Sequence, residues 1–344
     1  MSYKFDYLVF IGRFQPFHIG HAQVINRALS LARNVIVLVG SANKPRTMKN
    51  PWTFDERAQM IKDSLAAEGD EGRVAILALR DRTYNDQMWV ADVQEKVERL
   101  VACMPRSKES KIGIIGHAKD ASSFYLKLFP QWELVEHEMN EVVNATDLRS
   151  LLFEGKNLKY LQGLLPATVY KDVEQFSKTA AFAQLVREYD HVKKYKEAWK
   201  AAPYAPIFVT TDAVVVQSGH ILLVRRKHFP GEDLLALPGG FLNQNERIED
   251  GVIRELREET KLKVPVPVFK GSVKSTKVFD APDRSLRGRT ITHASLIELP
   301  PGELPPVKGS DDAKEALWVP IAEIREEEMF EDHFAIIQSM LGYI

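Results

Sequence analysis

The chain has 344 residues, which is long enough for two domains with separate cores. Its composition, 45% hydrophobic and 27% charged residues, is typical of a soluble globular protein. Its formal net charge of −1 argues against general binding to nucleic acid or to an anionic membrane, because such proteins usually carry a basic excess.

The chain start contains no basic segment followed by a long apolar one, and no apolar run approaches the roughly 20 residues that span a bilayer. We therefore expect a cytoplasmic protein with no membrane partner. The single cysteine, Cys103, excludes an intramolecular disulfide and is expected to be a buried or half-buried thiol within VERLVACM.

Short apolar runs alternate with helical patterns in the first half of the chain. The runs are DYLVFIG (6–12), NVIVLVG (34–40), RVAILAL (73–79) and KIGIIG (111–116), with WELVEHE (132–138) as a fifth strand. Helical periodicity lies between them at about 19–33, 54–67 and 86–103. This alternation predicts an α/β domain with a parallel sheet and helices on both of its faces.

Residues 147–200 have helical periodicity, including one long charged helix from residue 169 onward, and two prolines in APYAP (202–206) then predict a boundary. Beyond it, IFVTTDAVVVQ, HILLVRRK, VPVFKGSV and RTITHASLIEL indicate strands, with one charged helix near 246–260. We therefore expect a first domain over 1–185, a helical linker over 186–205 and a mixed α+β domain over 206–344.

The turn after the first strand reads GRFQPFHIGH and carries His18 and His21 three residues apart. In a parallel sheet, ligands bind beyond the carboxyl ends of the strands, and a following helix N-terminus offers amides to an anion. Gly20 would let the backbone approach such a ligand closely. Alone, the pattern also fits a turn with two structural histidines; a zinc pair is disfavoured, because no third ligand stands at motif spacing.

The longer string decides between these interpretations. GRFQPFHIGH resembles the signature of the nucleotidylyltransferase superfamily, and in particular of the archaeal-type nicotinamide-mononucleotide (NMN) adenylyltransferases. Three further segments resemble that family in order: GSANKPRTMKNPWTFDER (40–57), GHAKDASSFYLKLFPQW (116–132) and NATDLRSLL (144–152). The resemblance implies a Rossmann-like domain that transfers AMP from ATP to NMN, giving NAD and pyrophosphate, with Mg²⁺ bridging the phosphates.

The same resemblance implies roles for individual residues. Catalytic roles fall on His18, His21 and Arg149; ATP binding on Gly12, Arg13, Phe14, Gly20, Thr146 and Arg149; and NMN binding on Asn85, Asp86 and Trp89. Arg149 and Arg57, the latter at the end of the PWTFDER block, could each instead be a surface-helix arginine.

The second motif is GGFLNQNERIEDGVIRELREETKL (239–262). On a helix, Glu255, Glu258 and Glu259 are spaced i, i+3 and i+4, so their carboxylates share one face. Carboxylates that close repel one another unless a cation lies between them, and hard divalent ions prefer oxygen ligands. The motif therefore predicts a metal site, although a surface helix with many salt bridges is the alternative.

This string resembles the Nudix box. The resemblance implies a hydrolase that uses Mg²⁺, with Mn²⁺ as a possible substitute. The implied metal ligands are Glu255, Glu258 and Glu259, with Glu246 as an outer ligand, and Glu258 is also given a catalytic role. Lys261 departs from the box, which has glycine there; if the backbone is left-handed, lysine costs roughly 1 kcal/mol relative to glycine.

The loop VFDAPDRSLRGRT (278–290) resembles a segment that Nudix domains of NAD metabolism place near the substrate, which implies that Arg284, Arg287 and Arg289 contact phosphate or ribose. The alternative is a solvated basic loop. The whole arrangement resembles the bacterial bifunctional adenylyltransferase/ADP-ribose pyrophosphatases, so the expected ligands are ATP, NMN and ADP-ribose.

The sequence leaves open two alternative functions and the oligomeric state. The Nudix half could be a non-hydrolytic sensor of ADP-ribose or NAD that regulates the adenylyltransferase, or the first half could act on another phosphorylated acceptor, such as a pantetheine or choline-type phosphate. A homo-oligomer is compatible with the sequence, which does not specify the oligomeric state.

Overall fold

The computed structural model describes residues 3–67, 69–103, 110–116, 125–137, 143–155 and 157–342. The chain divides into two compact units, Met1–Val186 and Arg187–Ile344, and the division falls within helix α6 (Ala180–Ala198). Each unit has its own sheet. No helix in the described part of the chain is long and apolar enough to cross a membrane.

Five strands form the sheet of the first unit in the order β3-β2-β1-β4-β5, and every pairing is parallel. The strands are β1 (Phe5–Gly12), β2 (Ala32–Val39), β3 (Val74–Ala78), β4 (Ile112–Gly116) and β5 (Glu133–Glu136). The predicted α/β architecture is thereby confirmed. The chain moves from β1 toward β3 on one side and later from β4 to β5 on the other, so the strand order reverses beside β1. Ligands bind at the carboxyl edge of such a reversal.

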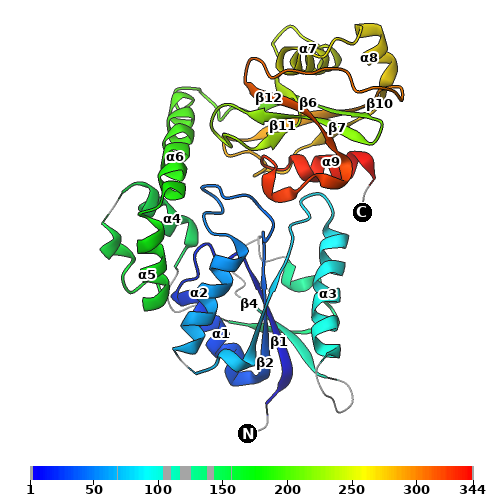
Figure 1. Cartoon of the computed structure of the whole chain (residues 1–344). Helices are drawn as coiled ribbons and strands as arrows, with labels where there is room; N and C mark the ends of the chain where they lie inside the picture. The colour runs from blue at the N-terminus through cyan, green and yellow to red at the C-terminus, as the bar shows by residue number, and fades with distance from the viewer. Residues whose placement is uncertain are drawn as a thin grey trace. The chain divides into compact units, whose positions relative to one another are not determined.

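Three helices cover this sheet: α1 (Ile19–Leu31), α2 (Phe54–Ala66) and α3 (Asp86–Ala102). Alternate residues of β1 point to opposite faces, and Tyr7, Val9 and Ile11 form one core cluster with the buried valines of α3. Helices α1 and α2 lie on the opposite face (Figure 1). A short 3₁₀ turn, η1 (Glu71–Arg73), leads into β3.

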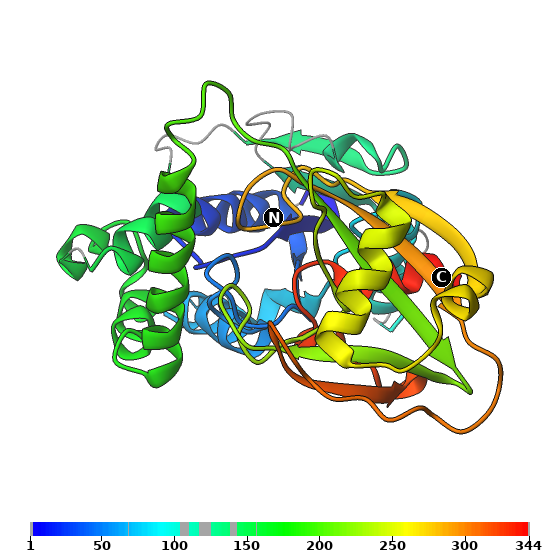
Figure 2. The same ribbon diagram turned by 90° about the horizontal axis from the view of Figure 1, so that it is seen from above.

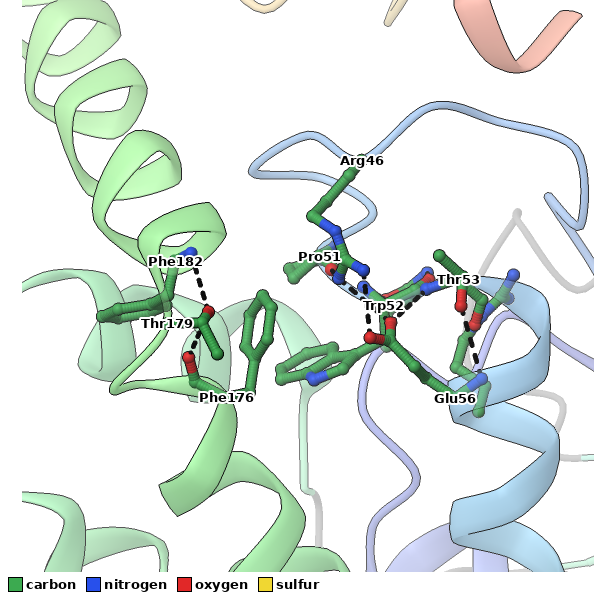
Figure 3. A network of polar contacts seen from close by, with 10 residues as sticks. Arg46, Pro51, Trp52, Thr53, Glu56, Phe176, Thr179 and Phe182 are labelled. Atoms are coloured by element: carbon green, nitrogen blue, oxygen red, sulfur yellow. Dashed lines mark hydrogen bonds and ion pairs between the residues drawn. The ribbon is translucent and has the colours of Figure 1, made fainter.

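The helical region after β5 consists of α4 (Ala145–Phe153), the 3₁₀ turn η3 (Leu158–Leu161), α5 (Ala167–Phe176) and α6. The prediction of one long helix from residue 169 was wrong, because the chain breaks between α5 and α6. The hydroxyl of Thr179 donates to the Phe176 carbonyl at 2.7 Å and accepts from the Phe182 N–H at 3.2 Å (Figure 3). One side chain thus ends the first helix and caps the second.

The second unit contains a seven-stranded mixed sheet with helices beside it, which confirms the predicted mixed α+β class. The path is β10-β11-β6-β7-β12, with β8 paired to β7 and β9 to β6, and β11 with β6 is parallel while the other pairs are antiparallel. The strands are β6 (Phe208–Gln217), β7 (His220–Arg226), β8 (Leu235–Ala236), β9 (Gly239–Phe241), β10 (Val273–Phe279), β11 (Thr290–Glu298) and β12 (Ala313–Pro320).

Helix α7 (Ile248–Thr260) lies across this sheet (Figure 2), and its apolar face buries Val252, Ile253 and Leu256 in the core. The sheet separates α7 from α9 (His333–Leu341), as Figure 1 shows. The remaining helical elements are α8 (Val266–Ser272) and the 3₁₀ turns η4 (Ile321–Glu323) and η5 (Glu326–Glu328).

The segment VPVFKGSV was predicted as a strand, but residues 266–272 form helix α8. Pro265 caps this helix and Pro267 lies in its first turn, where a missing N–H breaks no intrahelical bond. Phe269 is fully buried in the core cluster. The alternation of apolar residues in VPVFKGSV therefore belongs to the start of a helix and not to a strand.

Cys103 was predicted to be buried or half-buried, but it is exposed. It directly follows the last residue of α3, whose buried positions are Val93, Val97 and Val101. Cys103 therefore falls just outside the apolar periodicity that suggested burial.

Helix α7 ends at Lys261, whose φ of 53° and ψ of 22° are left-handed. Because a side chain is strained there, Lys261→Gly should raise the free energy of unfolding of the second unit by about 1 kcal/mol in denaturant titration. Lys263→Gly, which is outside the left-handed residues, is the matched control and should give no gain. A Lys261→Gly chain no more stable than the wild type would contradict this account.

Candidate active sites

The first candidate site is the turn between β1 and α1. Phe14 has a left-handed φ of 54°, and His18 is the residue before the first turn of α1. The His18 backbone N–H donates to Nδ1 of His21 at 3.3 Å, and the two rings stack with their centroids 3.6 Å apart. The two predicted histidines therefore lie together at the helix N-terminus.

The environment of His21 determines which nitrogen holds its proton. Burial, and then the charge of His18, hold the pKa of His21 well below its ordinary value of 6.5. Because Nδ1 accepts a backbone hydrogen bond, the neutral ring carries its proton on Nε2. His21 can therefore donate a hydrogen bond to an anion without being charged itself.

Gly12 and Phe14 shape the turn beneath these histidines. A Cβ on Gly12 would lie 2.8 Å from the Phe14 ring, so glycine lets that ring fold back against the end of β1. Phe14 is 1% exposed, and its ring meets His21 edge-on at 4.8 Å. The Phe14 ring therefore packs against the ring of His21. Gly20 is buried in the first turn of α1.

The predicted second segment reaches this turn through Arg149. Arg149 is 7% exposed; its Nη1 donates to the Gln15 carbonyl at 2.7 Å, and its Nη2 to the Thr146 hydroxyl at 3.2 Å. Asn144 caps α4 by accepting from the Thr146 N–H at 2.9 Å. The start of α4 therefore contacts the turn after β1, although Arg149 and Gln15 are 134 positions apart in the sequence.

Three arginines lie in this turn or against it: Arg13, Arg57 and Arg149. Burial lowers the pKa of Arg149 and of Arg57 to about 10, and the charge of Arg13 adds to the lowering in both, while the charge of Asp81 opposes it at Arg57. The surface-helix interpretation of Arg57 was wrong, because its side chain is 1% exposed. A group of cations that repel one another favours an anionic ligand between them.

The residues predicted for NMN binding lie at the start of α3. Asn85 caps the helix by accepting from the Met88 N–H at 3.0 Å, and Asp86 is in the first turn. Trp89 is partly buried, 6.0 Å from the rings of Tyr125 and Phe129. Residues 117–124 of the GHAKDASSFYLKLFPQW segment lie outside the described residues.

The second candidate site lies on α7 of the second unit. Arg254 donates from Nε to Glu246 at 2.7 Å and from Nη1 to Glu255 at 2.7 Å. The same Nη1 contacts Glu258 at 3.0 Å. These carboxylates raise the pKa of Arg254, with the hydrogen bond to Glu246 as the largest cause. The predicted glutamates thus surround one guanidinium.

Glu259 completes the set of predicted ligands from a buried position. It is 7% exposed, and one carboxylate oxygen accepts from the Gly239 N–H at 3.0 Å. Burial raises the pKa of Glu259 to about 8 and also raises that of Glu255. A Cβ on Gly240 would lie 2.5 Å from Oε1 of Glu255, so the glycine leaves room for that carboxylate.

The donor set is suited to a divalent metal ion. Among the described residues, no three carboxylate, imidazole or thiolate groups are already grouped closely enough to hold a metal ion. Glu255 and Glu259 nevertheless supply hard oxygen donors, and burial disfavours their ionised form, even with the ion pair from Arg254 to Glu255 and the hydrogen bond from the Gly239 N–H to Glu259. A divalent cation would stabilise that ionised form, so the residues fit Mg²⁺ or Mn²⁺.

A cavity of about 300 Å³ opens beside these glutamates. Arg287 lines it and lies 5.0 Å over the ring of Phe241, while its Nε is buried without a hydrogen-bond partner among the described residues. Arg284 also lines it, but its guanidinium forms a buried two-bond pair with Asp332, both at 2.9 Å. Arg289 bonds to Asp280 and is not among the lining residues.

Sequence reasoning missed several other residues of this cavity. They are Asp212, Arg226, Glu331 and His333. Burial raises the pKa of Glu331, which accepts from the Leu286 N–H at 2.9 Å, and lowers that of His333, whose Nδ1 accepts from the Leu237 N–H at 2.9 Å. These residues come from β6, β7 and the segment at the start of α9, and no spacing in the sequence connects them with the box.

Two family models match the chain, one in each unit. The cytidylyltransferase-like model matches residues 9–95, and the NUDIX domain model matches residues 207–340. The first range includes the histidine turn, and the second includes α7 and the cavity.

Relatives extend the similarity to each unit and to the whole chain. A nicotinamide/nicotinic acid mononucleotide adenylyltransferase of Acinetobacter baylyi is 42% identical over 188 residues, covering 54% of this chain and 95% of the relative. An ADP-ribose pyrophosphatase of Methanocaldococcus jannaschii is 37% identical over 123 residues, covering 36% of this chain and 68% of the relative.

A crystal structure covers nearly the full length. It is a bifunctional NMN adenylyltransferase/ADP ribose pyrophosphatase from Francisella tularensis, complexed with AMP and a manganese ion. It is 37% identical, covers 98% of this chain and 99% of its own, and has a TM-score of 0.91.

The lowered pKa of His21 leads to a testable pH dependence. Because the folded-state pKa lies well below 6.5, the ring should stay neutral as the pH falls from 8 through 6.5, and protonate only in more acidic solution. Imidazole NMR shifts of the ligand-free chain, with the His21 signal identified by its loss in His21→Gln, measure this directly. A His21 midpoint at or above 6.5 would contradict the geometry described.

Proposed function

This chain belongs to the family of bifunctional NMN adenylyltransferases/ADP-ribose pyrophosphatases, and we propose that it makes NAD in the first unit and hydrolyses ADP-ribose in the second. It is an enzyme with a nucleotidyltransferase domain and a Nudix hydrolase domain. The substrates and the residues that act on them are the proposal.

The first reaction is an in-line transfer of AMP. A phosphate oxygen of NMN forms a bond to the α-phosphorus of ATP, the bond from that phosphorus to the bridging oxygen breaks, and pyrophosphate leaves. Such a transfer needs positioning and neutralisation of charge, and no covalent protein intermediate. The observation that carries this assignment is the stacked pair His18 and His21 beside the arginine cluster, at the carboxyl end of β1.

The residues of the first site divide this work. Nε2–H of His21 donates to a phosphate oxygen, with His18 beside it, while Arg13 binds the triphosphate from one side and Arg149 with Thr146 from the other. Gly12, Phe14 and Gly20 shape the turn that holds ATP. At the start of α3, Asn85 and Asp86 contact the NMN ribose or amide, and Trp89 stacks on the nicotinamide ring.

The second reaction adds water across the P–O–P bridge of ADP-ribose and gives AMP and ribose 5-phosphate. When bound by Glu255, Glu258 and Glu259, with Glu246 outside them, Mg²⁺ or Mn²⁺ supplies charge neutralisation and an activated water. Arg287 contributes a cation and an unpartnered Nε donor at the wall of the cavity. Arg284 holds that wall in place through Asp332. Arg289 is not among the residues that line the cavity and has no part in this proposal.

Hydrolysis distinguishes this proposal from the sensor alternative. The full chain incubated with ADP-ribose and Mg²⁺ should release AMP, detected by chromatography, and removal of the metal with a chelator should stop the release. Measurable binding of ADP-ribose without AMP formation would favour a sensor and reject hydrolysis.

Two substitutions should separate the activities. His18→Ala should lower NAD formation from ATP and NMN about 100-fold or more, because it removes a group that faces the phosphates, and should leave ADP-ribose hydrolysis unchanged. Glu258→Gln should lower hydrolysis by about 10- to 100-fold and leave NAD formation unchanged. Steady-state rates of both reactions on each purified chain are the measurement, and one substitution that disables both would contradict two separate sites.

A further inference from the structure

Arg57 occupies an unusual position for a charged side chain. It lies in the first turn of α2 and is 1% exposed. Its guanidinium has no carboxylate within ion-pair distance among the interactions of the described residues, and backbone carbonyls surround it instead. A buried guanidinium persists only where hydrogen bonds replace its lost water.

The carbonyls belong to the two turns at the carboxyl edge of the sheet. Nη1 of Arg57 donates to the carbonyls of Arg13 and Gly40, both at 2.6 Å. Nη2 donates to the Ser41 carbonyl at 3.1 Å, and Nε to the Thr53 carbonyl at 3.0 Å. One planar group therefore joins the turn after β1, the turn after β2 and the start of α2.

The two turns also touch each other directly. The Gly40 N–H donates to the Gly12 carbonyl at 2.8 Å, and a Cβ on Gly40 would lie 3.7 Å from Cγ of Arg13. Ser41 is left-handed, with a φ of 50°, and Asp81 holds it by accepting from its N–H at 3.1 Å and its hydroxyl at 2.7 Å. Arg57 thus closes a ring of contacts around the backbone from which the Arg13 side chain leaves.

The backbone at the start of α2, which carries Arg57, is itself held by a cap and an ion pair. Thr53 and Glu56 form a reciprocal cap, and Arg46 pairs with both carboxylate oxygens of Glu56 at 2.9 and 3.0 Å (Figure 3). The Arg46 guanidinium also lies 5.1 Å over the ring of Phe176 from α5. This network fixes the backbone of α2 one residue before Arg57.

We propose that Arg57 is a positioning residue for the ATP phosphates: by holding the carbonyls of Arg13, Gly40 and Ser41 together, it sets the position of Arg13 and of the turn that carries the histidines. It acts through these groups and does not touch the substrate. The inference rests on the proposed adenylyltransferase function. Lysine cannot replace it, because an ammonium group is a single donor point, whereas the guanidinium fork donates to four carbonyls in three separate segments.

The test is Arg57→Lys in the full chain, which keeps the charge and removes the fork. The KM for ATP in NAD formation should rise at least 10-fold, whereas the KM for NMN and the rate of ADP-ribose hydrolysis should stay within 2-fold of the wild type. The split between the two KM values separates positioning of the phosphates from a loss of the folded first unit, which would lower the apparent kcat for NAD formation and leave both KM values unchanged.

Arg73→Lys is the matched control. Arg73 also donates to three backbone carbonyls, those of Leu29, Ala32 and Arg33, but these lie at the end of α1 and the start of β2, at the opposite edge of the sheet. Its substitution should leave the KM for ATP within 2-fold.

Several outcomes would overturn the proposal. They are an unchanged KM for ATP in Arg57→Lys, an equal rise in Arg73→Lys, or a parallel rise in the KM for NMN. Should Arg57→Lys fail to fold, as judged by circular dichroism and by loss of kcat for NAD formation, Arg57→Gln carries the same test, because it keeps two N–H donors without the charge. A wild-type chain that makes no NAD would reject the proposed function itself, whereas a wild type that makes NAD with variants of normal KM would reject only the role of Arg57.

Discussion

The first unit depends on one constraint: buried guanidinium groups with backbone carbonyls as partners. Arg57 and Arg149 both bind carbonyls of the turn after β1, at Arg13 and Gln15 respectively. Gln15 adds two hydrogen bonds to the Trp52 backbone, at 2.8 and 3.0 Å. Carbonyls satisfy these hydrogen bonds without adding a negative charge, so the turn is rigid and keeps the positive charge of Arg13 and Arg149, while Asp81 and Glu56 offset part of the charge of Arg57. The same interactions therefore hold the fold at this edge and prepare it for a triphosphate.

The second unit has the opposite arrangement of charge. Its helix α7 gathers carboxylates at the sheet, and burial of Glu259 raises its pKa to about 8. Arg254 satisfies part of this negative charge at Glu246, Glu255 and Glu258. A cationic first site suits the phosphates of ATP directly, whereas an anionic second site suits a pyrophosphate only together with a metal ion. Under the proposed function, the two units therefore bind related phosphate groups by different electrostatic means.

The parts of the structure that depend on local pattern were predictable from the sequence. The five parallel strands of the first unit and the amphipathic helix α7 follow from periodicity, and the clustering of Arg149 with the histidine turn follows from the motifs. The rest depends on tertiary partners. Arg284 was expected at the ligand, but its guanidinium is held by Asp332, 48 positions away, and nothing in the local sequence marks that pair. Helix α8 and the break before α6 depend on proline and threonine positions that periodicity does not register.

The central claim is that the two units hold two different ligands at two separate sites. A crystal structure of the full chain with a non-hydrolysable ATP analogue and Mn²⁺ tests it most directly, because anomalous scattering locates the manganese. The account predicts the triphosphate between His21, Arg13 and Arg149, and a manganese ion at Glu255, Glu258 and Glu259 of α7. A triphosphate found only in the cavity of the second unit, with the histidine turn free of ligand, would contradict it.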